Sequence, residues 1–402
     1  MTMLSKLSRF SWTMFAATLL LIACGTIAIK SAGAARADAV FHTMWKSNLW
    51  TAAVGLALYF ALAFADYRKI VKWCAMPAYV VAVAMLAAVL AFGTSRFGGR
   101  RWLWFFQPSE VAKLCVIALV ARLASSSRLP LGLVKERFSG FALLSLVVAL
   151  PIALILLEPD LGTALVLVPA VVMVFFTGGV WRTGLVALLS AAAVSAALVL
   201  GAVHEAEKPG VAPERREAIL RFVPLREHQV RRVKVFLFPD EDIHDSGYTL
   251  RQAKISIGSG GLSGKGIGKG ESNHLKYLPQ AISMNDFIFC VWAEETGFIG
   301  SAALIALFAL VILPGVFVAY RAEDGTGRLL ALGLTTLFFA HVFINIAMSL
   351  GLVPITGLPL PFISSGRTFL VTMMASLGMV QSVSIYGGSS AVQEYPQNNE
   401  RT

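Results

Sequence analysis

The sequence predicts an all-α polytopic membrane protein with about ten transmembrane helices. Of its 402 residues, 57% are hydrophobic and only 14% are charged, and the mean hydropathy is +0.72. A soluble chain carries about a quarter charged residues, and a helix needs roughly 20 apolar residues to cross a bilayer. Such runs lie at 10–30, 47–65, 73–92, 109–124, 140–157, 161–179, 183–203, 287–320, 328–352 and 366–386. We interpret the first run as an uncleaved helix, because similar runs follow along the whole chain.

Basic residues in the short loops orient these helices with both termini in the cytoplasm. The short inner loops then contain Arg68, Lys69, Lys72, Arg122, Arg128, Lys135, Arg137, Arg182, Arg321 and Arg328. The outward loops are 30–46, 93–108, 158–160, 204–286 and 353–365. We therefore predict a single membrane domain over residues 1–402, with one large extracytoplasmic loop at 204–286 between spans seven and eight.

Charge and cysteine content narrow the classes of partner. The net charge of +11 indicates anionic lipid headgroups or an anionic substrate, and makes nucleic acid an improbable partner. The cysteines lie in or beside apolar runs, without metal-ligand spacing or a disulfide pattern, so we interpret them as packing residues. They are Cys24, Cys74, Cys115 and Cys290.

The most informative polar residue is Asp286, which lies between a glycine-rich polar stretch and the eighth apolar run. An acid against a bilayer is costly and is a candidate functional residue. The alternative is that Asp286 caps the N-terminus of the following helix. Because Glu294 and Glu295 lie early in this run, we expect its membrane portion to start near Phe298.

The loop at 93–108 places Arg96, Arg100 and Arg101 on the outer side, against the orientation signal. An anionic substrate at the outer face would explain them. Glu110 and Lys113 follow at a spacing of three, so they share one helix face and can form an ion pair. The alternative to a substrate role for this pair is a neutralised contact that holds the bundle together.

A short turn joins the fifth and sixth spans and contains two acids. Asp160 is a candidate N-cap of the sixth helix. Glu158 has no such role, and we expect it to pair with an outer arginine or with Lys113. Earlier in the chain, Trp102 and Trp104 fit the aromatic belt at the membrane interface, and for Trp104 we favour that role alone.

The long outer loop has two parts. Basic and apolar residues alternate over 215–236, which predicts an amphipathic helix on the lipid headgroups, or alternatively a solvated helix. Residues 256–270 read SIGSGGLSGKGIGKG. Their backbone N–H groups could face an anion, although the nucleotide-binding pattern GxxxxGK[ST] is absent. A flexible lid is the alternative.

Six segments, in order, carry a family resemblance. They are GGRRW (98–102), QPSEVAKL (107–114), EPDLGTAL (158–165), GYTLRQAKISIGSGGLSGKGIGKG (247–270), DFIFCVWAEETGFIG (286–300) and NIAMSLGLVPITGLPLPFIS (345–364). With them the chain resembles the SEDS proteins (shape, elongation, division and sporulation), that is RodA and FtsW. The short N-terminal tail and the ending GMVQSVSI (378–385) favour the RodA branch.

The resemblance implies a peptidoglycan glycosyltransferase of the bacterial inner membrane. Such proteins polymerise lipid II, an undecaprenyl-diphosphate-linked disaccharide-pentapeptide, at the outer face, with a class B penicillin-binding protein as the crosslinking partner. The essential acid of the family maps to Asp286, and further site positions map to Arg101, Trp102, Glu110 and Lys113. The candidate substrate-binding residues that complete this set are Gln107, Glu158, Lys265 and Arg367.

The chain departs from the family pattern at three places. Leu278-Pro279 is followed by Gln280 where the family has an acid, and Asn285 precedes Asp286 where threonine is usual. After PFIS the sequence reads Ser365-Gly366-Arg367-Thr368 in place of YGGSS. Arg367 adds an outward cation.

Glycosidic bond formation needs a base for the acceptor hydroxyl and stabilisation of the leaving diphosphate. We assign Asp286 as the base, and Arg101 and Lys113, with Arg367, to the diphosphate. A divalent cation, Mg²⁺ or Mn²⁺, could share that role, although no metal-ligand spacing is visible. A lipid II flippase and a non-catalytic scaffold of the cell-wall machinery are the alternatives. The polar residues gather at one face without an inverted hydropathy repeat, which argues against a transporter.

Overall fold

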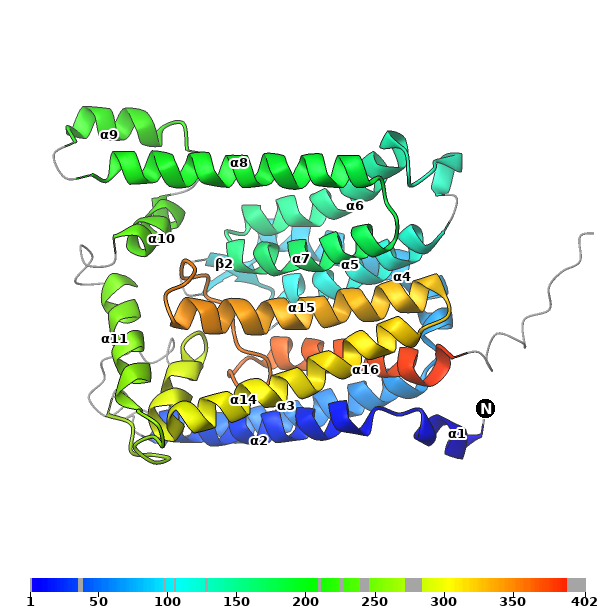
Figure 1. Cartoon of the computed structure of the whole chain (residues 1–402), viewed down its shortest axis with the longest axis horizontal. Helices are drawn as coiled ribbons and strands as arrows, with labels where there is room; N and C mark the ends of the chain where they lie inside the picture. Colours follow the sequence, from blue (N-terminus) through cyan, green and yellow to red (C-terminus); the bar gives the residue numbers. More distant parts are fainter. Residues whose placement is uncertain are drawn as a thin grey trace, which may run out of the picture.

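The computed structural model describes residues 2–34, 39–96, 99–104, 106–126, 129–208, 211–223, 227–238, 246–271 and 284–388. Long helices run side by side and form a bundle (Figure 1). Within these residues, ten helices coincide with the ten predicted spans. They are α2 (Trp12–Ala34), α3 (Ala39–Phe64), α4 (Tyr67–Phe92), α5 (Pro108–Ser125), α6 (Phe138–Leu157), α7 (Leu161–Thr177), α8 (Arg182–Ala206), α14 (Ile288–Arg321), α15 (Gly325–Ser349) and α16 (Arg367–Tyr386).

Eight of these helices are long and apolar enough to cross a membrane by themselves. The exceptions are α5, which begins with buried polar residues, and α7, which has 17 residues. Both lie inside the bundle, where α5 packs against α4, α7 and α15. The predicted membrane fold is therefore confirmed, and the two helices outside this set of eight pack against neighbouring helices.

The shorter elements lie at the two ends of the bundle. They are α1 (Met3–Ser8), the hairpin of β1 (Thr94–Arg96) and β2 (Gly99–Trp102), a 3-10 turn (Pro130–Gly132), α9 (Pro213–Leu220), α10 (Glu227–Leu237) and α11 (Ser246–Ser259). In Figure 1, β2 and α9 to α11 lie at one end, and α1 lies at the opposite end. Segments that are far apart in sequence therefore meet at one end of the bundle.

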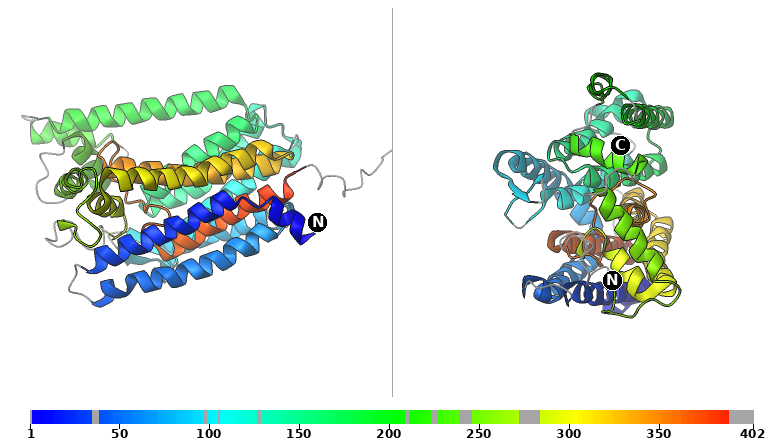
Figure 2. Two further views of the ribbon diagram at one scale, coloured as in Figure 1. Left: turned by 60° about the horizontal axis from the view of Figure 1, so that its bottom comes forward. Right: turned by 90° about the vertical axis from the view of Figure 1, so that its left-hand side faces the viewer.

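Helices α15 and α16 form the centre of the bundle, and α8 lies at its edge. In the most apolar 18-residue stretch of each helix, 72% of α15 and 78% of α16 is buried, against 6% of α8. Figure 2 shows α8, in green, along one edge in both views. Most of the surface of α8 therefore faces outward from the bundle.

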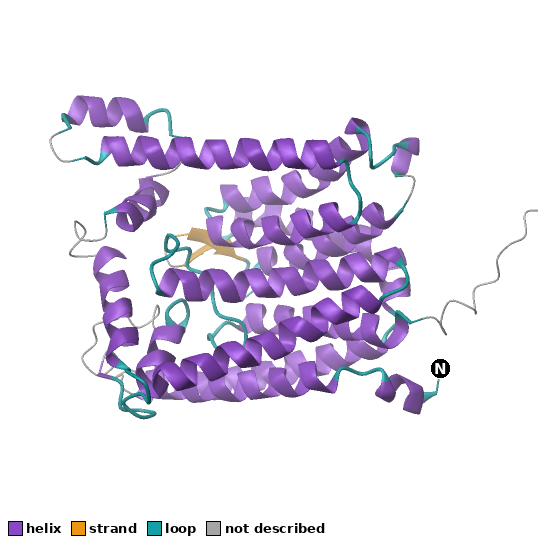
Figure 3. Ribbon diagram, in the orientation of Figure 1, coloured by secondary structure: helices purple, strands orange, loops and turns teal. Residues whose placement is uncertain are grey.

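The loop between α15 and α16 folds back into the bundle (Figure 3). Gly25 lies near the middle of α2, and a Cβ atom on it would be 2.1 Å from the Phe362 carbonyl oxygen. Leu360, Phe362 and Ile363 are fully buried. The loop predicted at 353–365 therefore reaches well below the end of the bundle, and the absence of a side chain at Gly25 makes room for it.

Helix α14 is interrupted at Gly297, whose φ of 67° and ψ of −162° are not helical. This backbone region is essentially restricted to glycine. The uninterrupted part of α14 therefore begins at Phe298, near the predicted start of the membrane-crossing portion. The short segment before the interruption carries Glu294 and Glu295, which are both buried.

The glycine-rich segment fills this interruption, so the anion-binding and lid interpretations are not supported. The amide of Phe298 donates to the Gly261 carbonyl at 2.9 Å, and the amide of Lys265 donates to the Glu294 carbonyl at 3.0 Å. Backbone N–H groups that could have faced an anion are thus used to hold the two halves of α14.

The prediction of a single amphipathic helix over 215–236 is wrong. The segment contains α9 and α10, which are separate short helices. Arg216 and Lys234 both bind Glu207 at the end of α8, at 2.7 and 2.6 Å. The basic residues that were expected to face headgroups therefore include two that fasten the loop to α8.

Gly297→Ala should destabilise the protein by at least about 1–3 kcal/mol, the cost of a residue forced into this backbone region. In addition, a Cβ atom there would lie 2.3 Å from the Gly264 nitrogen. The measurement is the thermal midpoint of the detergent-purified protein. Gly201→Ala in α8 is the control, because nothing lies within 4 Å of its Cβ position. Equal midpoints for the two variants would contradict the assigned role of Gly297.

Candidate functional site

Asp286 lies directly before α14, where it keeps part of its surface accessible. The N-cap position of α14 is Phe287, and the helix has no side-chain cap hydrogen bond. The capping interpretation of Asp286 is therefore not supported. Its backbone is held by Asn345 of α15, whose amide nitrogen donates to the Asp286 carbonyl at 2.9 Å and to the Leu358 carbonyl at 2.6 Å.

Two arginines surround the Asp286 carboxylate. Arg232 of α10 donates to the Thr356 carbonyl at 3.1 Å. A Cβ atom on Gly357 would be 3.4 Å from Asp286 Oδ2 and 3.9 Å from Arg232 Nη2, so both side chains flank this glycine. Burial raises the pKa of Asp286 to about 6, Arg232 and Arg101 oppose that rise, and Asp160 adds to it. The carboxylate is thus ionised at neutral pH but more basic than an ordinary aspartate.

Asp160 connects the segment that carries Arg101 and Gln107 to the start of α7. It accepts from the Thr163 amide at 3.2 Å, which confirms its predicted N-cap role. Gln107 donates to it at 3.1 Å, and an Arg101 nitrogen lies 3.7 Å away. Arg101 also donates to the Pro159 carbonyl. Arg101 and Gln107 are therefore brought to the same polar cluster as Asp286.

Glu158 is fully buried beside this cluster. Neither of its carboxyl oxygens has a hydrogen-bond partner within the described residues. Burial, with the charge of Asp160, raises its pKa to about 8, and Arg101 opposes that rise. Within the described residues, the expected pairing with an arginine or with Lys113 does not occur, and the raised pKa favours the protonated form of Glu158.

The predicted pair of Glu110 and Lys113 forms, with Lys113 Nζ 2.9 Å from Glu110 Oε2. Lys113 is fully buried, and its Nζ atom also lies 2.8 Å from His341 Nε2. The ring of Phe369 lies 5.7 Å from the same ammonium group. The charge of Lys113 is therefore compensated inside the bundle, between α5, α15 and α16.

The remaining predicted site residues are Lys265, Arg367 and Trp102, which lie in three further segments. Lys265 lies in the glycine-rich segment and binds Glu294 at 2.8 Å. Arg367 is exposed at the first position of α16. Trp102 lies in β2, where it pairs with Thr94, and it is partly exposed. Of these, Lys265 has a clear structural role.

The sequence analysis missed Arg232, His341 and Asn345. Arg232 was one of many basic residues in a segment whose register was unknown. His341 lies in an otherwise apolar run, and an ionisable residue there is itself a signal of function. Asn345 opens one of the family motifs, but its contact with the Asp286 backbone depends on a loop that no local pattern predicts.

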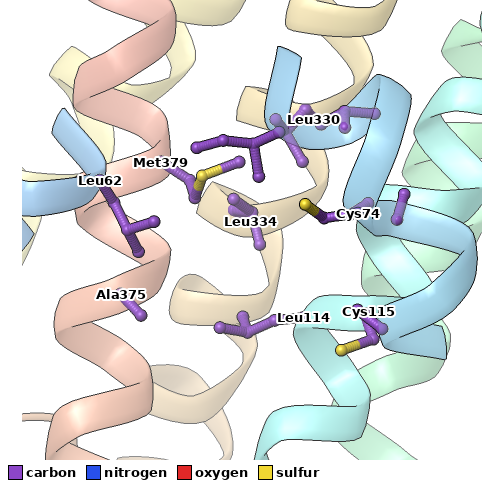
Figure 4. Close-up of a pocket in the computed structure, with 13 residues that line it drawn as sticks. Leu62, Cys74, Leu114, Cys115, Leu330, Leu334, Ala375 and Met379 are labelled. Atoms are coloured by element: carbon purple, nitrogen blue, oxygen red, sulfur yellow. The ribbon is translucent and has the colours of Figure 1, made fainter. Parts of the chain in front are cut away.

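A separate apolar cavity of about 140 Å³ lies between α3, α4, α5, α15 and α16 (Figure 4). Its lining includes Cys74 and Cys115, and none of the candidate site residues. All four cysteines are free. Within the part of the chain that the structure describes, no group of three or more His, Cys, Asp or Glu side chains could hold a metal ion.

Comparison with known proteins identifies the family. Residues 11–388 match the family model of the cell cycle proteins FtsW, RodA and SpoVE. The chain is 35% identical over 345 residues to "Peptidoglycan glycosyltransferase MrdB" of Escherichia coli (strain K12), covering 85% of each chain.

Two solved structures extend the likeness to the fold. One is described as "Structural coordination of polymerization and crosslinking by a peptidoglycan synthase complex", with 28% identity, a TM-score of 0.71 and coverage of 93% of this chain and 97% of that chain. The other is the rod shape determining protein RodA of Thermus thermophilus, with 26% identity, a TM-score of 0.65 and coverage of 94% and 98%. The chain belongs to the FtsW/RodA/SpoVE family, and its similarity to RodA supports the RodA-like assignment.

Proposed function

We propose that this chain is a peptidoglycan glycosyltransferase that polymerises lipid II into glycan strands for cell-wall elongation or division. Its family membership and the names of its relatives support the activity. The observation that supports Asp286 as the centre is a carboxylate of raised pKa that feels the charges of Arg232 and Arg101, just before the start of α14. A base needs a pKa near the working pH to be both ionised and effective.

In the proposed reaction, Asp286 takes the proton of the acceptor C4 hydroxyl. The freed oxygen attacks the anomeric carbon of the donor sugar and forms the glycosidic bond. The bond between that carbon and the diphosphate oxygen breaks, and the lipid diphosphate leaves with the electron pair. The leaving group is already stable, so a second acid is not required, unlike in glycoside hydrolysis.

The leaving diphosphate needs positive charge. Arg101 is partly exposed beside Asp160 and supplies one cation. Arg367 supplies another, at a helix N-terminus where the backbone also favours an anion. Because Lys113 is neutralised by Glu110, we assign it the role of fixing α5 against α15. No step is assigned to Mg²⁺ or Mn²⁺, since the described residues supply no three-ligand cluster for a resident ion.

The active face is proposed to be the outer side of the bacterial inner membrane. The distribution of basic residues in the short loops supports this orientation. The proposed partner is a class B penicillin-binding protein that crosslinks the new strands. A structural neighbour that belongs to a complex for polymerization and crosslinking supports this partner.

Asp286→Asn should abolish polymerisation of lipid II by the purified protein and leave its thermal midpoint nearly unchanged. The amide keeps the shape of the side chain but cannot take a proton. For the unmodified chain, activity should fall as the pH drops below about 6, as Asp286 is protonated. A normal rate in the Asn variant would refute the assignment of the base. Translocation of lipid II in liposomes without polymerisation would favour the flippase.

Arg101→Ala should lower kcat/KM for lipid II about tenfold or more, because a charged hydrogen bond contributes about 1.5–3 kcal/mol. Lys113→Ala should instead destabilise the protein by about 3–5 kcal/mol, because it leaves a buried carboxylate unpaired. Both effects are measured as activity per folded molecule and as thermal midpoints, with Arg215→Ala on α9 as the exposed control. Unchanged activity in Arg101→Ala would place the diphosphate elsewhere.

Cysteine labelling tests the orientation. In a chain lacking its native cysteines, Phe222→Cys should react with a membrane-impermeant reagent added to intact spheroplasts, and Leu131→Cys should not. Both positions are highly exposed, at 88% and 91%, so accessibility within the protein does not distinguish them. If only Leu131→Cys reacted, the protein would have the opposite orientation in the membrane, and the proposed topology would be wrong.

A further inference from the structure

Arg232 is the charged residue near Asp286 that the reaction scheme above leaves without a role. We propose that Arg232 is a substrate-binding residue that holds the diphosphate of the lipid-linked donor beside Asp286, and that α10 is the strap that places it there. This inference rests on the proposed function, and it adds a segment of the large loop to the site.

The guanidinium of Arg232 lies near the Asp286 carboxylate and still has hydrogen-bond donors available for a ligand. Arg232 and Asp286 flank Gly357 from within 4 Å of the same Cβ position, and no ion pair within 4.0 Å joins them in the described residues. One nitrogen donates to the Thr356 carbonyl. A guanidinium has five N–H donors, so most remain for oxygens of a ligand. Its planar fork matches phosphate oxygens.

The charged groups around Arg232 also favour the binding of an anion. Arg101 is close enough to Arg232 to oppose its positive charge, and Asp286 and Asp160 partly offset that repulsion. Arg101 is held by Asp160 and the Pro159 carbonyl. When Asp286 takes the proton of the acceptor, one negative charge is lost from this group. A diphosphate between the two guanidiniums then supplies the compensating charge at the moment it develops.

The strap is anchored at its other side. Glu207, at the C-terminus of α8, has a buried carboxylate that accepts from Lys234 at 2.6 Å and from Arg216 at 2.7 Å. The rings of His204 and Phe238 stack at 5.2 Å. α10 therefore spans from the end of α8 to the re-entrant loop. Arg232 of α10 contacts this loop through the Thr356 carbonyl and lies beside Gly357.

Gly357 keeps that space open. Its φ of 75° lies in the left-handed region that favours glycine, and any side chain would enter the gap between the carboxylate and the guanidinium. A phosphate oxygen needs this gap in order to contact both the cation and the reacting sugar. The same contact would be blocked by a closed Asp286–Arg232 ion pair, which the observed geometry avoids.

Kinetics of lipid II polymerisation test the role of Arg232. Arg232→Gln should raise KM about tenfold or more, the loss expected for a charged hydrogen bond. It should also move the acidic limb of kcat/KM to higher pH, because removing a cation raises the pKa of Asp286. Arg232→Lys should recover the pH limb and only part of the KM. Arg231→Gln, at the exposed neighbouring position, should change both quantities by less than about twofold. An Arg232→Gln variant with unchanged KM and pH limb overturns the proposal.

Direct binding separates this inference from the proposed function. In the full chain carrying Asp286→Asn, Arg232→Gln should weaken binding of undecaprenyl diphosphate about tenfold and leave binding of undecaprenol unchanged. Equal loss for both lipids would mean that Arg232 only supports the fold, which overturns the inference. If the unmodified chain fails to polymerise lipid II but binds the diphosphate through Arg232, the inference stands and the proposed function falls.

Discussion

The side-chain amide of Asn345 joins the segment that carries Asp286 to the loop between α15 and α16. It is fully buried, and its nitrogen donates to the carbonyls of Asp286 and Leu358. These carbonyls belong to the start of α14 and to the re-entrant loop. Buried carbonyls without a donor cost about 1–3 kcal/mol each. The position of Asp286 relative to the loop that Arg232 contacts therefore depends on one buried residue of α15.

The charged residues near Asn345 form two groups, which differ in how completely their charges are paired. Below the site, Lys113 is matched by Glu110 and His341, so this group is closed to ligands. At the site, Arg101, Arg232, Asp160 and Asp286 are close but incompletely paired. An incompletely paired set costs stability, and such sets are typical of places where a ligand completes the charge balance. Helices α5 and α15 link the two groups, because Gln107 at the N-cap of α5 donates to Asp160 and Asn345 of α15 donates to the Asp286 carbonyl.

The sequence predicted what depends on local composition. All ten helices were located, because twenty apolar residues are a local signal. Glu294 and Glu295 led to the prediction that the membrane portion starts near Phe298, but the break of the helix at Gly297 was not predicted. The cap at Asp160 and the pair of Glu110 and Lys113 were also predicted, since each needs only a short spacing. The roles of these residues in substrate binding remain predictions.

Contacts between distant segments could not be predicted. The glycine-rich segment packs into the interruption of α14 and joins two regions about thirty residues apart. The contacts are backbone hydrogen bonds, which do not require particular side chains and so cannot be recognised in the sequence. The approach of Arg232 to Gly357 depends on how α10 is fastened to α8. The histidine partner of Lys113 comes from a helix more than two hundred residues away.

The contact between Gly25 and Phe362 has a consequence for biogenesis. The first membrane helix is made early in synthesis, and the loop that rests on it is made near the end. Until that loop and α16 are inserted, Gly25 marks an unfilled recess, and Asn345 has no Leu358 carbonyl to hold. A chain that ends before this loop therefore lacks both the packing on Gly25 and one of the two carbonyls that Asn345 holds.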